Sequence, residues 1–452
     1  MKRTLIQNAH IVNEGRIFRG SVVVEGEQIA EILVGEAQPA LPCDFLIEAQ
    51  GSYLLPGIID EHVHFRDPGL THKADILTES MAAAAGGVTS IMDMPNTHPQ
   101  TTTLEALEAK RELLAERCLV NHACYFGATN SNYTDFAKLD RNRVAGVKIY
   151  MGSSTGNMLV DRMKSLQQIF GGTDLLISAH CEDQTIINQQ TEQYKKLYPE
   201  GMVPVEAHPL IRNAEACFRS SELAVRLADE AGARLHIMHI STARELELFS
   251  DGPLTSKRIT AEACVPHLFF CDADYRSLGA RIKCNPAIKT ADDRAAIREA
   301  VNNGRIDVIA TDHAPHLLSE KEGGALKAAS GIPVVQYSPV SMLELCDQGV
   351  FSLEKIVEKM CHAPALLYRI PKRGFVRTGY QADLVLVKPQ SPWEVADTKT
   401  LSKCGWSPFE GRTFGWKVCK TFVNGHLLFD GEAVDTTYRG QELLFTPDSI
   451  PQ

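Results

Sequence analysis

Strand-like and helix-like segments alternate along most of this chain, and the alternation narrows the choice of fold sharply. Short apolar runs typical of strands are separated by stretches with helical character, such as residues 104–115 and 215–231. This is the pattern of β-α units arranged around a parallel sheet. Eight alternations predict an α/β protein with a (β/α)8 (TIM) barrel, whose chemistry lies at the carboxyl ends of the strands. The predicted strands are residues 54–59, 88–92, 120–125, 144–150, 175–178, 234–238, 259–265 and 306–310.

Both ends of the chain show short strand patterns joined by turns. Near the start, residues 20–24 lead through a Glu-Gly-Glu turn to residues 29–34. Near the other end, residues 421–428 contain an Asn-Gly pair, the commonest signal of a tight β-hairpin. We therefore expect the two ends to meet in a small β-sandwich domain. The expected division is a composite domain of residues 1–53 and 375–452 and a barrel of residues 54–374.

Composition and charge limit the class of protein. With 452 residues and 44% hydrophobic content, the chain can form one large and one smaller globular domain. Its formal net charge of -10 argues against a nucleic-acid partner, which would need a basic face. There is no apolar run of ~18 residues and no signal-peptide pattern, so we expect no membrane association and a cytoplasmic location. The twelve cysteines form no Cys-x-x-Cys pair, which indicates reduced thiols rather than a disulfide framework.

Histidines collect at the predicted carboxyl ends of the barrel strands. His62 and His64 follow the first strand, and because side chains alternate along a strand they project to the same side. His180 ends the fifth strand, His239 ends the sixth, and Asp312 follows the eighth. A single histidine at such a place is more often structural than a ligand. Four histidines and an aspartate at one end of the barrel favour a site for a divalent metal such as zinc.

Lys148 lies inside the apolar run of the fourth predicted strand. An unpaired ammonium inside a barrel is costly, so Lys148 either points outwards, pairs with an acid, or has a lowered pKa and reacts with CO2. A carboxylated lysine could bridge two metal ions ~3.5–4 Å apart that share a hydroxide and polarise a carbonyl oxygen. Asp312 could then ligate one ion and transfer a proton, or only hold a histidine tautomer. Arg66, Asn96 and His316 are donors close to this centre and suit a ligand with a carboxylate.

Three motifs resemble those of the amidohydrolase superfamily and, within it, the dihydroorotases. They are Pro-Gly-Ile-Ile-Asp-Glu-His-Val-His-Phe-Arg-Asp-Pro-Gly at residues 56–69, Asp-Met-Pro-Asn-Thr at 93–97, and Ala-Thr-Asp-His-Ala-Pro-His at 310–316. The resemblance covers nearly the whole chain. It implies the reversible cyclisation of N-carbamoyl-L-aspartate to L-dihydroorotate and water by a metal-bridged hydroxide, in pyrimidine (UMP) biosynthesis.

The resemblance also implies roles for individual residues and partners. Asp312 would be the general acid and base. The chain would form a homo-oligomer, a dimer or a tetramer, and could associate with aspartate transcarbamoylase. The implied ligands of two zinc ions are His62, His64 and Asp312 for one ion, His180 and His239 for the other, and N-carboxylated Lys148 between them. The implied substrate contacts are Arg66, Asn96, Asn285, His316, Ser330 and Gly331.

Two features depart from the pattern common in bacterial relatives. Lys148 stands where many bacterial dihydroorotases of this type have aspartate. Residues 330–336 differ from the usual Phe-Gly-containing loop, so Ser330 and Gly331 are matched less directly than the remaining contacts. The polar segment 319–331 could be a mobile lid or a plain surface loop.

Rival functions are compatible with the same motifs. Dihydropyrimidinases or hydantoinases and allantoinases share the fold and the metals, but their substrates lack a ring carboxylate and do not need Arg66. Hydantoinases also place a tyrosine where this chain has Ser153. An arginine fork on a carboxylate is worth roughly 1.5–3 kcal/mol, enough to set specificity. Two more distant functions are an inactive dihydroorotase-like scaffold for aspartate transcarbamoylase, which would have lost ligands, and a structural zinc protein, which would use cysteines.

Overall fold

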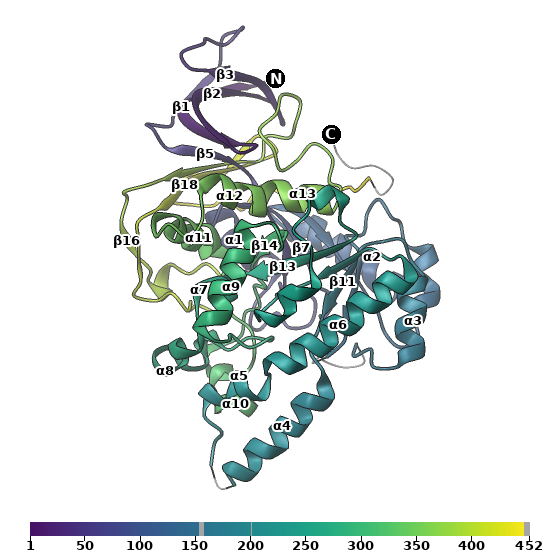
Figure 1. Ribbon diagram of the computed structural model, residues 1–452. Coiled ribbons are helices and arrows are strands. Elements are labelled where there is room, and N and C mark those ends of the chain that lie inside the picture. Colours follow the sequence, from purple (N-terminus) through teal and green to yellow (C-terminus); the bar gives the residue numbers. More distant parts are fainter. Residues whose placement is uncertain (153–157, 200, 447–452) are drawn as a thin grey trace.

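A computed structural model of the chain describes residues 1–152, 158–199 and 201–446, and Ser153 lies outside these ranges. Parallel strands form a barrel at the centre of the molecule, with helices around it (Figure 1). The barrel closes between its last and first strands, where the His64 N–H donates to the His313 carbonyl oxygen at 2.7 Å. The predicted (β/α)8 barrel is confirmed, with β8 and β9 sharing one strand position. The barrel strands are β6 (Ile58–Val63), β7 (Val88–Asp93), β8 (Asn121–Cys124), β9 (Phe126–Gly127), β10 (Val147–Tyr150), β11 (Ile177–His180), β12 (Leu235–Ile237), β13 (Ile259–Cys264) and β14 (Val308–Ala310).

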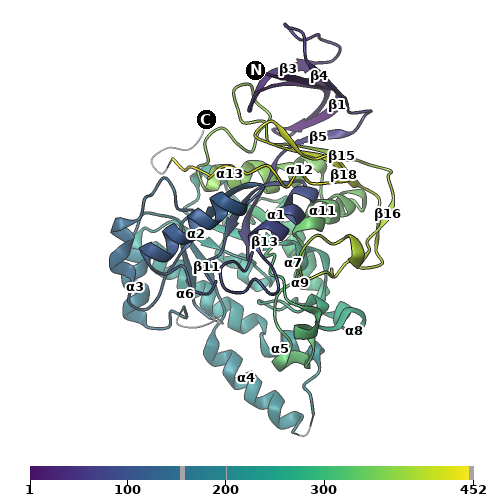
Figure 2. The same cartoon turned by 180° about the vertical axis from the view of Figure 1, so that it is seen from behind.

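Helices follow the strands and cover the outside of the barrel (Figures 1 and 2). Helix α6 has clear sequence limits, since the Asn213 side chain accepts from the Ala216 N–H at its start and Gly232 at its end has a left-handed φ of 68°. The helices predicted over residues 104–115 and 215–231 lie within α2 and α6. In the described ranges the α-helices are α1 (Ile76–Ala85), α2 (Leu104–Arg117), α3 (Met163–Gly171), α4 (Gln184–Leu197), α5 (His208–Ile211), α6 (Ala214–Ala231), α7 (Val265–Phe269), α8 (Tyr275–Leu278), α9 (Ala291–Asn302), α10 (Gly324–Lys327), α11 (Ser338–Asp347), α12 (Leu353–Val357) and α13 (Ala363–Leu367).

Strands from both ends of the chain form one mixed sheet beside the barrel, in the order β19-β18-β15-β5-β1-β2-β3 with β4 next to β1. Asn424 and Gly425 join β18 to β19, and both have the positive φ (48° and 75°) that a tight hairpin turn requires. The composite β-sandwich expected from the two termini is confirmed, while its exact boundaries stay a prediction. The strands are β1 (Arg3–Asn13), β2 (Arg16–Glu25), β3 (Gln28–Val34), β4 (Phe45–Glu48), β5 (Tyr53–Pro56), β15 (Leu384–Lys388), β18 (Lys417–Val423) and β19 (His426–Phe429), and a separate pair is β16 (Trp393–Glu394) with β17 (Thr413–Phe414).

One predicted strand, over residues 54–59, is in fact two. β5 pairs with β1 and β15 of the terminal sheet, whereas β6 pairs with β7 of the barrel. The break falls at Gly57, where a Cβ atom would lie 2.1 Å from Thr89 Oγ1 and 2.8 Å from Asp383 Cβ. Only glycine fits at this point, so the chain passes from sheet to barrel here.

Helix α4 projects away from the barrel, as both views show (Figures 1 and 2). Asp183 caps its start by accepting from the Thr185 and Ile186 N–H groups. A small apolar cluster joins α4 to α5 and α10, and its buried members are Ile187, Val203, Ala207, Ile211, Ala216 and Ala325. The sequence left open whether segment 319–331 is a mobile lid or a surface loop. In the structure it contributes to the short helices η7 (Leu318–Lys321) and α10 on this side of the barrel.

Two expectations from composition can be compared with the structure. Within the described ranges, no helix combines the length and the apolar character needed to cross a membrane. All twelve cysteines are free and most are buried. Burial raises the pKa of Cys118 and of Cys181 to about 12, so these side chains are neutral thiols at physiological pH.

Candidate active site

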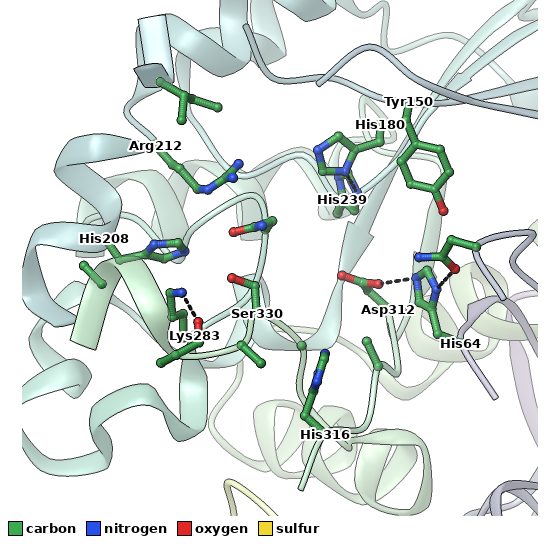
Figure 3. A pocket seen from close by; sticks show the side chains of 18 of the residues that line it. His64, Tyr150, His180, His208, Arg212, His239, Lys283, Asp312, His316 and Ser330 are labelled. Atoms are coloured by element: carbon green, nitrogen blue, oxygen red, sulfur yellow. Dashed lines mark hydrogen bonds and ion pairs between the residues drawn. The ribbon is translucent and has the colours of Figure 1, made fainter. Parts of the chain in front are cut away.

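A cavity of about 650 Å³ opens at the carboxyl ends of the barrel strands. All the residues that the sequence singled out as metal ligands or substrate contacts line it, including Ser330 and Gly331. Its walls come from the strand ends, from α4 and α5, and from the segment around α10. Figure 3 shows the labelled side chains pointing into this space from several elements. The structure therefore brings together the whole predicted set.

The first group of candidate ligands surrounds Asp312. His62 Nε2 lies 3.3 Å and His64 Nε2 lies 3.1 Å from Asp312 Oδ1. The far nitrogens of both rings are occupied: His62 Nδ1 is 2.9 Å from Glu262 Oε1 and His64 Nδ1 is 2.7 Å from Asn96 Oδ1. These partners fix the tautomer in which each Nε2 carries a lone pair, as a metal ligand must.

The second group is His180 and His239. His180 Nδ1 lies 2.9 Å from His239 Nε2, so at least one of these facing nitrogens is unprotonated (Figure 3). His180 Nε2 is held at 3.0 Å by Glu182, which in turn accepts from Arg212 at 2.6 Å. Burial alone would raise the pKa of Glu182, but Arg212 and His180 outweigh it and bring the value to about 2. Glu182 is therefore an anion that fixes the His180 ring.

A single carboxylate links the two groups. Glu262 Oε1 accepts from His62 Nδ1 and also from the backbone N–H of His239, at 2.8 Å. The φ of His239 is 41° and that of Asp312 is 48°, a left-handed conformation that is uncommon for residues other than glycine. Asp312 is kept in it by its neighbour Thr311, whose hydroxyl and N–H both donate to Asp60. Such backbone strain persists only where the surrounding structure enforces it. Here the left-handed backbone turns the His239 and Asp312 side chains toward the candidate metal site.

Lys148 points into the barrel and is 0% exposed. Its Nζ contacts Met238 Sδ and lies 5.0 Å from the centre of the Tyr150 ring. Its side chain therefore does not point outwards, and no carboxylate of the described residues is within ion-pair distance of its Nζ. Burial lowers the pKa of Lys148 to about 8, which increases the share of neutral amine that can react with CO2.

These side chains fit a divalent metal centre. Ligand atoms of His62, His64 and Asp312 lie within 4.8 Å of one another. His239 Nδ1 is buried and has no hydrogen-bond partner among the described residues. A buried imidazole nitrogen normally has such a partner. Burial also lowers the pKa of His64 to about 4, so its ring is a neutral donor. Imidazole and carboxylate donors without cysteine are typical of catalytic rather than structural zinc.

A cationic corner lies beside the candidate metal ligands. Arg66 is 7% exposed, donates from Nε to the Pro315 carbonyl at 3.1 Å, and has no carboxylate within ion-pair distance among the described residues. His316 lies between Arg66 and Lys73, at 3.2 Å from each. Burial and these two cations lower the pKa of His316 far below its usual range. A buried, unpaired guanidinium requires an anion, and the fork geometry suits a carboxylate.

Several residues that line the pocket were not found from the sequence. Tyr150 could have been predicted, because it lies two residues after Lys148 and therefore on the same side of β10. Lys73 follows the first motif closely, but nothing in the sequence places it beside His316. The remaining ones come from helices and loops whose position depends on tertiary packing. Among them are His208, Arg212 and Lys283.

Known proteins of this kind match the chain over nearly its full length. The sequence pattern of the amidohydrolase family matches residues 53–428. A dihydroorotase of Halobacterium salinarum is 33% identical over 426 residues, covering 93% of this chain and 97% of its own. A dihydroorotase of Bacillus caldolyticus is 33% identical over 430 residues, covering 92% and 96%. Among solved structures, L-hydantoinase from Arthrobacter aurescens has a TM-score of 0.92 at 27% identity and covers 98% of this chain and 100% of its own.

The barrel, the terminal sheet and the histidine-rich pocket together define a class of enzymes, and the chain belongs to the amidohydrolase family. Within this family it belongs with the dihydroorotases, because relatives of that name exceed 30% identity over more than nine-tenths of the chain.

Proposed function

We propose that the chain is a dihydroorotase that interconverts N-carbamoyl-L-aspartate and L-dihydroorotate in pyrimidine biosynthesis. The observation that carries the proposal is the buried Arg66, unpaired by any described carboxylate and adjacent to the metal-ligand cluster. The substrate of this reaction has a carboxylate on the ring, next to the amide bond that opens. A site for that substrate needs a cation at this place, and a site for a neutral ring does not.

The proposed metal ligands form a binuclear zinc site. The six ligands are His62, His64, Lys148, His180, His239 and Asp312, with Lys148 N-carboxylated. When bound, two divalent ions would supply a water activated at neutral pH and would polarise the ring carbonyl. The proposal is supported by the distances within the two groups, by the unpartnered His239 Nδ1 and by the lowered pKa of Lys148.

Asp312 is the proposed general acid and base. Burial would raise its pKa, but His62 and His64 lower it well below the usual range, so the side chain is a carboxylate at neutral pH. In ring opening, Asp312 accepts a proton from the attacking water and returns it to the leaving ring nitrogen. Its position beside both His62 and His64 keeps the accepting oxygen at the metal centre.

The proposed substrate contacts surround the ring. Arg66 and His316 bind the carboxylate together with Asn96, whose Oδ1 lies 2.7 Å from His64 Nδ1. Asn285, Ser330 and Gly331 also line the cavity and are the proposed contacts to the ring amides. Hydrogen bonds to charged groups contribute roughly 1.5–3 kcal/mol each, so the carboxylate contacts dominate specificity.

Hydantoinase is the second candidate, favoured by the high structural similarity to L-hydantoinase from Arthrobacter aurescens. A spectrophotometric assay of ring opening with dihydroorotate, hydantoin, dihydrouracil and allantoin separates the two, with metal analysis of the same sample. We expect dihydroorotate to be the preferred substrate by at least tenfold in kcat/KM. Faster hydrolysis of a neutral ring would contradict the proposal.

We also propose a homo-oligomer, a dimer or tetramer, located in the cytoplasm and able to associate with aspartate transcarbamoylase. Exposed apolar side chains at the end of α4, in the segment after it and on α5 support a contact between copies: Leu197 is 62%, Met202 is 63% and Leu210 is 55% exposed. Light scattering on the purified chain, alone and with aspartate transcarbamoylase, tests the two associations. A monomer at micromolar concentration would contradict the first.

A further inference from the structure

One wall of the active-site cavity consists of two chain segments that are distant in sequence. Residues 283–285 contribute Lys283 and Asn285, and residues 328–331 contribute Ser330 and its neighbours. Figure 3 shows Lys283 and Ser330 side by side on this wall. Neither segment belongs to a barrel strand, so the barrel sheet does not hold them in place.

A buried ammonium group lies behind this wall and binds both segments. Lys321 Nζ donates to the carbonyl oxygen of Lys283 at 3.0 Å and to those of Ala329 and Gly331 at 2.7 Å each. An ammonium has three N–H donors, and these three carbonyl groups use all of them. Lys321 is only 6% exposed, and no carboxylate of the described residues lies within ion-pair distance of its Nζ.

The backbone of the two segments is joined around the same point. The Gly331 N–H donates to the Lys283 carbonyl at 2.9 Å, and the Ala329 N–H donates to the Glu320 carbonyl at 2.7 Å. Gly331 has a φ of 143°, and a Cβ atom there would lie 2.4 Å from the Ala314 carbonyl oxygen. The segment is therefore packed closely against the chain that leads to His316, with no room for an added methyl group.

The contacts of Lys321 hold the backbone on both sides of Ser330. Its ammonium group binds the carbonyl groups of the residues directly before and after Ser330. The backbone that carries the Ser330 side chain is therefore fixed at two points, and Figure 3 shows the Ser330 hydroxyl at the cavity. The same contact draws two backbone acceptors away from the space that an anionic substrate would fill.

A buried lysine at position 321 carries a cost in folding free energy. Burying an ammonium without a counterion costs free energy, and here burial lowers the pKa of Lys321 to about 7. Lys283 and Arg66 are nearby cations that add to this lowering. The cost is offset by three hydrogen bonds whose acceptors all belong to the wall of the cavity.

We propose that Lys321 is a positioning residue, whose ammonium group fixes the backbone at residues 283 and 329–331 so that Asn285 and Ser330 face the substrate. The inference rests on the proposed function only in naming dihydroorotate as the substrate.

Lys321→Met tests the proposal, because methionine keeps the unbranched shape and removes the donors. Lys327→Met is the matched control, since Lys327 lies in the same segment but is exposed and does not line the cavity. For dihydroorotate we expect Lys321→Met to raise KM by about tenfold or more, the loss expected for hydrogen bonds from a charged group, with kcat within about threefold and unchanged metal content. Lys327→Met should leave both constants unchanged.

Hydrogen–deuterium exchange gives a readout that does not depend on the substrate. In Lys321→Met, peptides covering residues 280–288 and 317–332 should exchange faster, and peptides of β12 should not. If the wild-type chain does not act on dihydroorotate, the proposed function fails, while the exchange pattern still decides the role of Lys321. Unchanged exchange in both segments, or a fall in kcat with KM unchanged, would overturn the inference.

A second variant covers the case in which Lys321→Met does not fold. Lys321→Ala leaves a space for n-propylammonium, which restores the missing atoms and donors. Added n-propylammonium should lower the raised KM of this variant toward the wild-type value, and tetramethylammonium, which has no N–H donor, should not. Equal effects of the two cations would mean that Lys321 contributes charge or volume rather than hydrogen bonds, against the inference.

Discussion

Three of the four candidate histidine ligands have a partner on the ring nitrogen that faces away from the centre. Glu262 holds His62, Asn96 holds His64 and Glu182 holds His180. These partners orient the rings before any metal binds and keep them in the tautomer that can donate a lone pair. The sequence could predict the histidines themselves, because strand ends are visible as the limits of apolar runs. It could not predict the pairing of His62 with Glu262 or of His64 with Asn96, because these partners come from separate strands and loops.

Arg66→Ala tests the carboxylate contact at the scale of one residue. Loss of a fork that binds a charged group should cost roughly 1.5–3 kcal/mol, which raises KM for dihydroorotate by about tenfold to a hundredfold. Metal content should stay at the wild-type value, since Arg66 is not among the ligands. Steady-state kinetics with dihydroorotate and with hydantoin measure the effect, and an equal loss for both substrates would argue against a carboxylate contact.

Asp312→Asn tests the proton transfer. The amide keeps the shape of the side chain but cannot accept a proton, so kcat should fall by about a hundredfold or more. Steady-state kinetics with dihydroorotate measure kcat. A fall of less than about tenfold would exclude Asp312 as the acid and base.

Among the barrel strands, β13 connects the two groups of candidate metal ligands. Its Glu262 accepts from His62 on β6 and from the backbone of His239 after β12, so one side chain aligns ligands of both metal groups. The prediction that chemistry gathers at the carboxyl ends of the strands was sufficient to select the candidate ligands. It did not reveal that Glu262 connects them, because an acid within a strand is equally expected to pair with a lysine.

Glu262→Gln should weaken the binding of both metals. The amide can keep one hydrogen bond but carries no charge, and loss of such a partner typically costs about tenfold to a hundredfold in metal affinity. Metal-free protein titrated with zinc against a competing chelator gives the affinity of each site. Weakening at one site only would mean that Glu262 does not align the two groups together.

The junction at Gly57 shows where a sequence pattern fails at this scale. Residues 54–59 are uniformly apolar, so hydrophobicity gives no sign that one part belongs to the terminal sheet and the rest to the barrel. The division depends on the close approach of Thr89 and Asp383, which are distant in the sequence. The position of Lys321 behind the cavity wall likewise depends on a contact with a distant segment, since it binds the Lys283 carbonyl.

At the scale of the whole molecule, buried titratable groups make the fold sensitive to acid. His122 on β8 is 2% exposed, and burial together with Arg111 lowers its pKa to about 4. The unfolded chain binds a proton at this residue near pH 6.5, well before the folded chain does. The stability that His122 contributes is therefore complete above pH 6.5 and is lost as the pH falls toward 4, up to roughly 3 kcal/mol.

His122→Leu should reduce this loss. Urea unfolding of the metal-free protein at several pH values between 4 and 7 measures it, with metal removed so that pH-dependent metal release does not contribute. The midpoint of the variant should fall less on acidification than that of the wild type. His72→Leu, at an exposed histidine, is the control and should behave as wild type. Parallel acid profiles for His122→Leu and wild type would contradict the prediction.

The metal content of Lys148→Ala, measured with activity on the same sample, decides whether Lys148 is a ligand shared by two metal ions. Removing the bridging ligand should leave fewer than two metal ions per chain and no measurable turnover of dihydroorotate, whereas the wild type should hold two. Two ions per chain and normal turnover in Lys148→Ala would contradict the proposed site.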